Sequence, residues 1–505
     1  MTGTAIVTVD TARQLGRIDE QVYGQFVEHI GRAIYGGVYE PGSPLSDAAG
    51  YRLDVIAACR ELAPTLLRWP GGNFASGYHW RDGVGPVAER PSRRDLAWNA
   101  IEPNTFGTEE FLELTRRLGC EAYLNLNTST GSLDEALGWL EYCNAKDPLP
   151  EVALRTEGPH PEPHGVRTWG LGNENYGWWQ HGHTTAAHYA ETAREWGKLL
   201  RWADPAIQLV AVGAPDPDWN WTVLRQAGRF VDFLSLHFYW HGNSSDMYAA
   251  TLAGPAGNER DVVAAHGMAL AAQKAANLPR PVRLCIDEWG VWSRTMKSFE
   301  GAAQNDLHDL MVQGLSARSG IDTRFEEAYD LKDALAVASW LHVMWRHPDK
   351  IGMATQAQMV NVIAPLHVGP EGLVRHTIFW PLAIARAHAG QLALDLLVRT
   401  EAEVGTGGVP GIAGNALPAL DAGATLDPVT GRVHLSLVNR LRDDELRVRV
   451  EGLGGTVDRI TLAHDDAFAG NSLEAPDNVV PRSDNVELTA ELVLPPHSHT
   501  TLLTR

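Results

Sequence analysis

The chain has 505 residues, of which 44% are apolar and 21% are charged. This composition is typical of globular proteins and excludes disorder, collagen-like repeats and coiled coils. Lys and Arg total 42 against 62 Asp and Glu, so the formal net charge is -20. Such a charge repels nucleic acid and anionic membranes, so we expect a neutral or weakly charged ligand. At this length the chain fits two domains, or one large barrel with an added module.

The sequence predicts neither export nor membrane insertion. No apolar run reaches the roughly 18 residues that span a bilayer, and the start of the chain lacks the basic and apolar regions of a signal peptide. Cys59, Cys120, Cys143 and Cys285 form no C-x-x-C pair, so neither a disulfide framework nor a zinc site is expected. We therefore expect a cytoplasmic protein with no cofactor or metal, and with neither nucleic acid nor membrane as partner.

The predicted elements between residues 20 and 385 alternate short apolar runs with longer amphipathic stretches. Helical spacing of apolar residues is clear at 132–143, 185–202 and 332–345. Runs that end in polar residues predict eight strands, at 22–27, 65–69, 122–126, 167–171, 208–212, 231–236, 282–286 and 352–362. Eight such units predict an α/β fold, a closed (β/α)8 TIM barrel with functional residues at the carboxyl ends of its strands.

From residue 386 to 505 the pattern changes to short alternating segments between Gly and Asp turns. Strands are predicted at 433–438, 446–450, 457–461 and 487–494, and no helix-length pattern is present. These segments predict a C-terminal antiparallel β-sandwich, completed by a strand at 5–9 within the N-terminal residues 1–19. The absence of a long linker in the sequence predicts that barrel and sandwich pack closely.

Two glutamates, Glu174 and Glu288, end the fourth and the seventh predicted barrel strands. Glycoside cleavage needs two carboxyls, one to protonate the leaving oxygen and one to attack or stabilise the sugar carbon. We expect Glu174 to be the acid, because partial burial and a negative partner disfavour its charge. We expect Glu288 to be the ionised nucleophile, held by Arg68. A lone glutamate at a strand end is more often structural, but this pair in a Trp-rich barrel favours catalysis.

An ordered series of motifs around these glutamates resembles glycoside hydrolase family 51, the α-L-arabinofuranosidases. In chain order the motifs are Gly24-Gln25-Phe26-Val27-Glu28-His29, Arg68-Trp69-Pro70-Gly71-Gly72-Asn73-Phe74, Asp95-Leu96-Ala97-Trp98, Gly172-Asn173-Glu174, Leu236-His237-Phe238-Tyr239, Ile286-Asp287-Glu288-Trp289 and Ala357-Gln358-Met359-Val360-Asn361-Val362. Gly-Asn-Glu by itself is a weak signal, but the ordered series is specific. The resemblance covers nearly the whole chain.

The resemblance implies a retaining exo-enzyme on a (β/α)8 barrel with a jelly-roll-like sandwich. Its substrates would be terminal non-reducing α-L-arabinofuranosyl residues of arabino- and arabinoxylo-oligosaccharides, cleaved through a covalent glycosyl-enzyme, and members of the family are commonly hexamers. Glu174 matches the acid/base of the family and Glu288 its nucleophile. Further residues match or border the positions that hold or wall the sugar: Glu28, Arg68, Asn73, Trp98, Asn173, His237, Tyr239, Trp292 and Gln358.

Other readings stay open at this point. Within the same chemistry the chain could be a β-xylosidase, a galactofuranosidase or an endo-acting β-glucanase, and outside it a sugar-binding protein without catalysis. Thr355, Gly290 and the loop at 175–179 differ from the usual family pattern and border the expected site, which leaves the leaving-group preference open. His181 and His183 lack a third ligand nearby and read as loop residues rather than a metal site.

Overall fold

Eight parallel strands close into a barrel, which confirms the predicted (β/α)8 fold. The computed structural model describes residues 3–240, 246–292, 325–409, 412, 415–488 and 491–505. The barrel strands are β3 (Gly24–Phe26), β4 (Leu66–Trp69), β7 (Glu121–Leu126), β8 (Thr168–Leu171), β9 (Gln208–Ala211), β10 (Phe233–Trp240), β11 (Arg283–Val291) and β12 (Ile351–Ala357). They are nearly continuous apolar runs because helices cover the barrel and side chains fill it.

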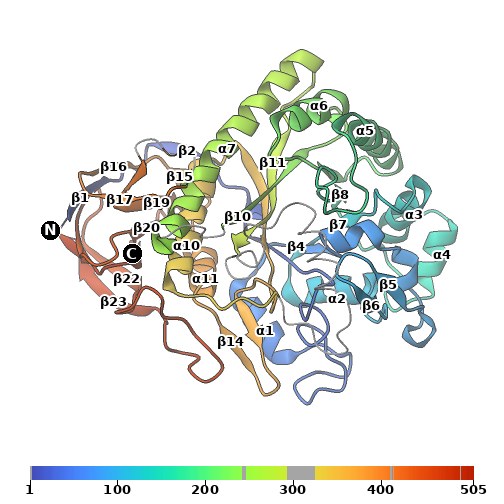
Figure 1. Ribbon diagram of the computed structural model, residues 1–505, viewed down its shortest axis with the longest axis horizontal. Coiled ribbons are helices and arrows are strands. Elements are labelled where there is room, and N and C mark those ends of the chain that lie inside the picture. The colour runs from blue at the N-terminus through green and yellow to red at the C-terminus, as the bar shows by residue number, and fades with distance from the viewer. Residues whose placement is uncertain (1–2, 241–245, 293–324, 410–411, 413–414, 489–490) are drawn as a thin grey trace.

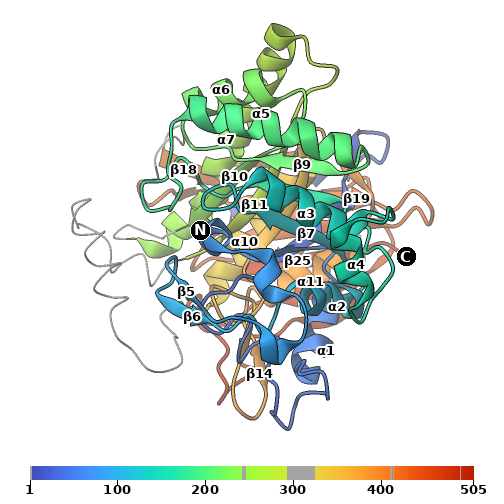
Figure 2. The ribbon, with the colours of Figure 1, turned by 90° about the vertical axis from the view of Figure 1, so that its right-hand side faces the viewer.

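A helix follows each barrel strand. In chain order these helices are α1 (Leu53–Leu62), α2 (Thr108–Leu118), α3 (Leu133–Asn144), α5 (Ala186–Ala203), α6 (Pro217–Ala227), α7 (Met247–Ala276), α10 (Leu331–Arg346) and α11 (Phe379–His388). Ser132 and Thr185 cap α3 and α5 by accepting hydrogen bonds from backbone N–H groups of the first turn. Figure 2 shows α5, α6 and α7 side by side along one flank of the barrel.

Shorter elements lie in the loops around the barrel. Helix α4 (Pro150–Thr156) follows α3, and four 3-10 helices lie at Glu20–Tyr23, Asn73–Gly77, Trp80–Gly83 and Val87–Glu89. Three small hairpins pair β5 (Arg93–Asp95) with β6 (Ala100–Glu102), β13 (Leu366–Val368) with β14 (Leu373–Arg375), and β17 (Glu403–Gly405) with β18 (Ala416–Pro418).

The eighth barrel strand is shorter than the predicted strand at 352–362. Strand β12 ends at Ala357, and the backbone N–H of Gln358 then bonds to the carbonyl of Ile363. The chain turns there, and the N–H of Met359 bonds to the carbonyl of Phe26. The apolar residues after 357 are buried in this turn rather than in a strand, so hydrophobicity alone could not mark the end of the strand.

Two sheets form the sandwich beside the barrel (Figure 1). The larger sheet has the order β2 (Gln14–Arg17), β15 (Leu392–Leu394), β19 (Leu420–Leu426), β20 (Val433–Asn439), β25 (Ser498–Leu503), β22 (Thr456–Leu462) and β23 (Arg482–Glu487). The smaller sheet has the order β16 (Leu397–Thr400), β1 (Gly3–Thr8), β21 (Leu446–Glu451) and β24 (Leu492–Leu494). Buried apolar residues of both sheets, among them Val7, Val448 and Leu435, form one core.

The sandwich differs from the sequence expectation in two places. Strand β1 joins it as predicted, but β1 pairs in parallel with β21, so the sandwich is not wholly antiparallel. The predicted strand at 487–494 is two strands, because Glu487 ends β23 in one sheet while β24 lies in the other. Residues 489–490, within the predicted strand, lie outside the described residues.

Helix α10 lies between the barrel and the sandwich, beside β20 (Figure 1). Every residue from Leu331 to Trp345 is buried. Gly423 of β19 permits the close approach, because a Cβ atom there would lie 2.8 Å from His342 and 2.9 Å from Trp345. The close packing of sandwich and barrel therefore depends on this helix.

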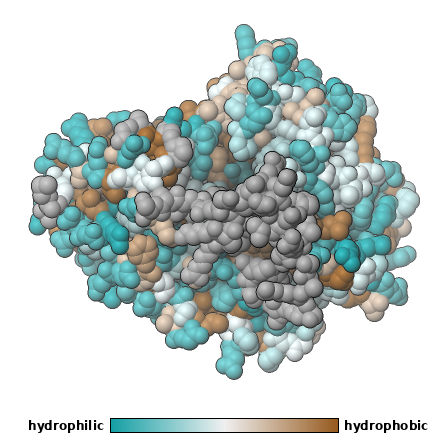
Figure 3. Space-filling view, in the orientation of Figure 1, coloured by the Kyte–Doolittle hydropathy of each residue, from teal (hydrophilic) through white to brown (hydrophobic). Residues whose placement is uncertain are grey.

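On the coloured part of the face in Figure 3, hydrophilic residues predominate and apolar residues are scattered among them. Within the described ranges, no helix has both the length and the hydropathy to cross a membrane.

Candidate active site

The two glutamates expected to be catalytic face each other at the carboxyl ends of barrel strands. Glu174 follows β8, and Glu288 lies on β11 opposite His237 of β10. The His237 Nδ1 atom lies 2.9 Å from Glu174 Oε1 and 3.4 Å from Glu288 Oε2. One carboxylate oxygen of each glutamate and this nitrogen all lie within 4.8 Å of one another. The barrel therefore brings two carboxyls and an imidazole to one point.

Arg68 of β4 holds the Glu288 carboxylate in place. Its Nη1 atom donates to Glu288 Oε1 over 2.8 Å, and its Nη2 atom donates to Asn173 Oδ1 over 2.8 Å. The hydroxyl of Tyr239 donates to the other oxygen of Glu288, also over 2.8 Å. Asn173 in turn donates to Asn73 Oδ1 over 3.3 Å. Both oxygens of Glu288 thus receive a hydrogen bond that holds the carboxylate in place.

A second polar group surrounds Glu28 beside this pair. Gln358 Nε2 donates to Glu28 Oε2 over 3.1 Å, and Trp98 Nε1 donates to Glu28 Oε1 over 3.1 Å. The turn after β12 makes this contact possible, since it carries Gln358 towards β3. Burial, and then the charge of Glu288, raise the pKa of Glu28 to about 8.

Aromatic rings connect the two polar groups. Trp292 lies 5.2 Å from the Tyr239 ring and 6.3 Å from the Phe325 ring, and Phe325 lies 5.3 Å from Trp98. All of the residues predicted for the site therefore lie in one contiguous cluster: Glu28, Arg68, Asn73, Trp98, Asn173, Glu174, His237, Tyr239, Glu288, Trp292 and Gln358.

Glycines let the loop after β4 approach these carboxylates. A Cβ atom on Gly72 would lie 2.6 Å from Glu288 Oε1, and one on Gly71 would lie 2.8 Å from Glu28 Oε1. Any side chain at either position would displace a carboxylate. The Gly71-Gly72 pair is therefore needed for the close approach.

Comparisons with known proteins agree with this geometry. Residues 58–252 match the model described as "Alpha-L-arabinofuranosidase 1 domain", and residues 287–498 match "Alpha-L-arabinofuranosidase C-terminal domain". Alpha-L-arabinofuranosidase C of Emericella nidulans is 34% identical, over 98% of this chain and 96% of that protein. The intracellular exo-alpha-(1->5)-L-arabinofuranosidase of Halalkalibacterium halodurans is 38% identical, over 78% of each chain.

A solved structure matches the whole length. A family 51 alpha-L-arabinofuranosidase from Bifidobacterium longum superposes with a TM-score of 0.89 at 30% identity, and the match covers 100% of this chain and 99% of that one. The chain belongs to glycoside hydrolase family 51, the α-L-arabinofuranosidases.

One electrostatic expectation for this family 51 member is wrong. Burial does raise the pKa of Glu174, but the hydrogen bond and charge of His237, with Trp179 and Tyr176, outweigh it, and the net pKa is lowered. Burial lowers the pKa of His237, but Glu288, Asp287 and Glu174 outweigh it and raise the pKa to about 10. Both shifts favour a proton on His237 rather than on Glu174, whose Oε1 atom lies 2.9 Å from His237 Nδ1.

Asp287 was expected beside Glu288 at its strand end, but Trp179 and Tyr176, which contact Glu174, were not among the residues predicted for the site. Asp287, whose pKa is lowered by Arg68 and His237 against the effect of its burial, lies 3.3 Å from His237 Nε2. Trp179 Nε1 donates to Glu174 Oε2 over 2.7 Å, and the Tyr176 hydroxyl donates to Glu174 Oε1 over 3.3 Å. The bulky loop at 175–179 signalled these last two contacts, but sequence alone could not place them on Glu174.

The residues that depart from the family pattern lie where predicted, at the border of the site. The Thr355 hydroxyl donates to the backbone carbonyl of Asp287 over 2.6 Å. Gly290 pairs with Tyr239 between β11 and β10. Among the described residues, neither makes a side-chain hydrogen bond to Glu174 or Glu288. Their contacts are instead with the backbone of the strands around the site.

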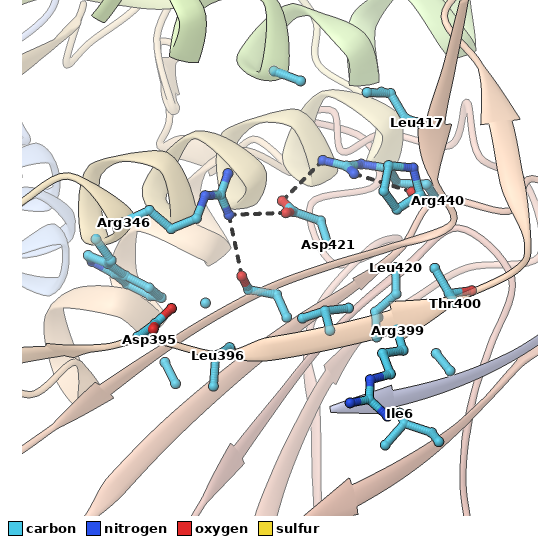
Figure 4. A pocket seen from close by; sticks show the side chains of 18 of the residues that line it. Ile6, Arg346, Asp395, Leu396, Arg399, Thr400, Leu417, Leu420, Asp421 and Arg440 are labelled. Carbon is cyan, nitrogen blue, oxygen red and sulfur yellow. Dashed lines mark hydrogen bonds and ion pairs between the residues drawn. The ribbon is translucent and has the colours of Figure 1, made fainter. Parts of the chain in front are cut away.

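A separate cavity of about 1000 Å³ lies between the sandwich, α7 and α10 (Figure 4). Strands β1, β16 and β19 line it together with those helices, and Arg346, Asp421 and Arg440 form an ionic cluster in its wall. None of the residues predicted for the active site lines this cavity.

Proposed function

We propose that the protein is a retaining exo-α-L-arabinofuranosidase. It removes terminal non-reducing α-L-arabinofuranosyl residues from arabino- and arabinoxylo-oligosaccharides through a covalent glycosyl-enzyme. The observation that carries the proposal is the pair Glu174 and Glu288, with one oxygen of each within 4.8 Å of the other. Retaining glycosidases hold their two carboxyls about 5 to 5.5 Å apart, whereas inverting enzymes leave a gap of about 6.5 to 9.5 Å for water.

In the first step Glu288 attacks the anomeric carbon and Glu174 protonates the leaving oxygen. The proton passes from His237 Nδ1 to Glu174 Oε1 and then to the glycosidic oxygen, as the bond from that oxygen to the anomeric carbon breaks. A bond forms between a Glu288 oxygen and the anomeric carbon. Asp287 keeps the Nε2 proton of His237 in place, so Nδ1 is the atom that exchanges its proton.

In the second step water releases the sugar. Glu174, now a carboxylate, takes a proton from water and passes it back to His237 Nδ1, and the oxygen of that water bonds to the anomeric carbon while the ester bond to Glu288 breaks. Arg68 and Tyr239 stabilise the departing carboxylate, since each donates to one of its oxygens. Two displacements return the anomeric configuration to that of the substrate.

The remaining polar residues are suited to the hydroxyls of a furanose ring. Asn73, Asn173, Glu28 and Gln358 supply amide and carboxyl groups on one side of the catalytic pair. Trp98 and Trp292 supply flat apolar faces for sugar C–H groups. Trp179 is 39% exposed beside Glu174, on the side where the leaving group departs.

The test is a panel of aryl glycosides followed by NMR. Aryl α-L-arabinofuranoside should be turned over far faster than aryl β-xyloside, aryl galactofuranoside or β-glucan. The first product in the NMR spectrum should be α-L-arabinofuranose, and added methanol should give methyl α-L-arabinofuranoside. First appearance of the β-anomer would contradict retention, and release of internal oligosaccharides would contradict exo action.

We also propose a cytoplasmic homo-oligomer, a hexamer by its resemblance to family 51. Four free cysteines and an intracellular relative support the location. Fractionation of cells and light scattering of the purified protein test both. For the domain division we propose a barrel from about residue 20 to 385 and a sandwich at 386–505 with residues 1–19. The gap between α11, which ends at His388, and β15, which begins at Leu392, supports a boundary a few residues later.

A further inference from the structure

The loop after β8 places a tryptophan against the expected catalytic acid. Trp179 Nε1 donates to Glu174 Oε2 over 2.7 Å, whereas His237 Nδ1 lies beside the other oxygen, Oε1, at 2.9 Å. Trp179 belongs to the bulky loop at 175–179, which departs from the usual family pattern. The two catalytic steps proposed for Glu174 and Glu288 do not use this tryptophan.

Hydrogen bonds within and beyond the loop hold Trp179 in place. The backbone N–H of Gly177 donates to the carbonyl of Glu174 over 2.7 Å, and that of Gln180 donates to the carbonyl of Gly177 over 3.0 Å. The side chain of Gln180 donates to Ser76 Oγ, in the 3-10 helix at Asn73–Gly77. The loop therefore fixes Trp179 independently of its hydrogen bond to Glu174.

Gly177 lets the indole ring of Trp179 fold back against the loop. A Cβ atom at Gly177 would lie 2.5 Å from Cε2 and 2.6 Å from Cζ2 of that ring. Tyr176 and Trp178 approach the ring at 5.9 and 5.8 Å between centroids, with interplanar angles of 87° and 85°. Neither of these two rings stacks in parallel on Trp179, so its exposed surface can accept a flat ring from solvent.

Exposure to solvent increases from the nucleophile towards this tryptophan. The side chain of Glu288 is 10% exposed and that of Glu174 is 14% exposed, whereas Trp179 is 39% exposed. The acid protonates the leaving oxygen, so the leaving group lies on the Glu174 side of the bound sugar. Trp179 is therefore exposed beside the path that the leaving group takes.

An exposed indole suits the ring of a xylopyranosyl leaving group. Aromatic faces bind flat apolar surfaces. All substituents of β-D-xylopyranose are equatorial, so both faces of its chair present axial C–H bonds, and the ring carries no exocyclic CH2OH group. An arabinofuranose ring is puckered and carries a CH2OH group, which hinders parallel stacking.

We propose that Trp179 binds the xylopyranosyl ring of the leaving group and at the same time positions Glu174 through its Nε1 atom. The proposal rests on the proposed function, because it concerns the leaving group of that reaction. One rigid indole that contacts both the leaving sugar and the acid fixes the distance between the acid and the glycosidic oxygen.

Two substrates test the stacking: methyl α-L-arabinofuranoside and methyl 3-O-α-L-arabinofuranosyl-β-D-xylopyranoside. Both leaving groups are alcohols that need protonation, so the part played by the acid largely cancels in the ratio of their kcat/KM values. Trp179→Leu should lower the ratio of xyloside to methyl glycoside by about 10-fold, the loss expected for one aromatic contact. Trp202→Leu, in the 73% exposed residue near the end of α5, is the matched control and should not change the ratio.

α-1,5-Arabinobiose as a third substrate tests the choice of sugar. Its kcat/KM, relative to that of the methyl glycoside, should fall less in Trp179→Leu than that of the xyloside. An equal fall would contradict the preference for a xylopyranosyl ring, as would native turnover of arabinobiose without turnover of the xyloside.

Trp179→Phe separates the positioning of Glu174 from the stacking, because it keeps a flat ring and removes the Nε1 donor. Burial raises the pKa of Glu174, but the hydrogen bonds of His237 and then of Trp179 outweigh it. Without the Nε1 donor this pKa should rise, so Glu174 and His237 keep their shared proton to higher pH. The alkaline limb of the kcat/KM profile should therefore shift to higher pH, and an unchanged limb would contradict the positioning.

Gly177→Ala tests the same ring without changing Trp179. Its Cβ atom would displace the indole, so the ratio of xyloside to methyl glycoside should fall as it does in Trp179→Leu. Native turnover of both substrates, with an unchanged ratio in Gly177→Ala and Trp179→Leu, would overturn the proposal and leave the proposed function intact.

NMR of the indole N–H groups tests the binding without turnover. In the full chain with ¹⁵N-labelled tryptophan, the signals of Trp179 and Trp202 are those missing from Trp179→Phe and Trp202→Leu. Addition of xylobiose should shift the signal of Trp179 and leave that of Trp202 in place. No shift at Trp179 would overturn the proposal. A shift at Trp179 in a chain that cleaves no arabinofuranoside would contradict the proposed function alone.

Discussion

Two ionic clusters use the same residue types and differ in their balance of charge. The active-site cluster consists of Arg68, Glu174, His237, Asp287 and Glu288. The interface cluster, between barrel and sandwich, consists of Glu259, His342, Arg346, Asp421 and Arg440, of which Arg346, Asp421 and Arg440 are labelled in Figure 4. Carboxylates outnumber guanidinium groups three to one in the first, and the two are equal in number in the second.

This difference sets the protonation of the two histidines. In the active-site cluster the excess of carboxylates overcomes burial and raises the pKa of His237 to about 10. In the interface cluster burial lowers the pKa of His342 despite Asp421, and the positive charges of Arg346 and Arg440 lower it further. The excess of carboxylates in the active-site cluster thus favours an imidazole that carries a proton and can exchange it. The interface cluster, whose charges balance, only connects the barrel and the sandwich.

Glu288→Ala should break the active-site cluster with the largest effect. Loss of the nucleophile should lower kcat on an aryl α-L-arabinofuranoside by about 10⁴-fold or more. The change in the free energy of unfolding should be far smaller than the corresponding change in the activation free energy. Steady-state kinetics and urea unfolding measure the two quantities. Glu259→Ala is the matched control from the interface cluster, and it should keep kcat. Near-normal turnover in Glu288→Ala would refute its role.

Glu174→Ala should have an effect that depends on the leaving group. Loss of the acid should slow cleavage of natural arabino-oligosaccharides by about 10²- to 10⁴-fold. Aryl substrates with acidic leaving groups should lose much less in the first step, because they need little protonation. A comparison of kcat/KM for both substrate types checks this, and equal losses would contradict the assignment of Glu174 as the acid.

Asp421→Asn should lower the free energy of unfolding and leave kcat unchanged. Asp421 is buried and accepts from His342 at 3.0 Å, and from Arg346 and Arg440 at 3.2 Å each. Removal of its charge leaves the buried Arg440 guanidinium short of a partner, while the half-buried Arg346 keeps Glu259, so the free energy of unfolding should fall by about 3 to 5 kcal/mol. Urea unfolding measures the loss. A lowered kcat per folded molecule would show that the two clusters are coupled.

The smallest expected effect is a pH dependence at the same interface. Burial, and then the charge of His342, lower the pKa of His499 to about 3, below its value of about 6.5 in the unfolded chain. Between these values the unfolded state binds the proton and the folded state does not, so stability falls as the pH drops. At pH 5 the loss from His499 is about 2 kcal/mol relative to pH 7.

His499→Asn should therefore lose about 2 kcal/mol less than the native protein between pH 7 and pH 5. Urea unfolding at both pH values measures the difference. His188→Asn is the control, because His188 is an exposed histidine at the start of α5. The same dependence in His499→Asn and in the native chain would contradict the shift in pKa.

The active-site cluster could be predicted largely from sequence, and the interface cluster could not. Glu174 and Glu288 each follow a short apolar run that predicts a barrel strand, and a barrel brings the carboxyl ends of its strands together, so local patterns sufficed. Asp421 and Arg440 lie among sandwich strands, and nothing near either residue indicates an ionic contact with α10. The charge of Glu174 was mispredicted because it depends on where the His237 ring lies, and no sequence pattern sets the orientation of a ring.

Helix α10 has no solvent-exposed face from Leu331 to Trp345, because the barrel covers one side and the sandwich covers the other. A chain cut after α11 would leave His342 and Trp345 uncovered where β19 and β20 now pack, and we expect such a fragment to aggregate. The sandwich thus covers the outer side of this barrel helix. Unfolding of the two parts should consequently be a single cooperative transition, and neither part is an independent module that could be exchanged between proteins.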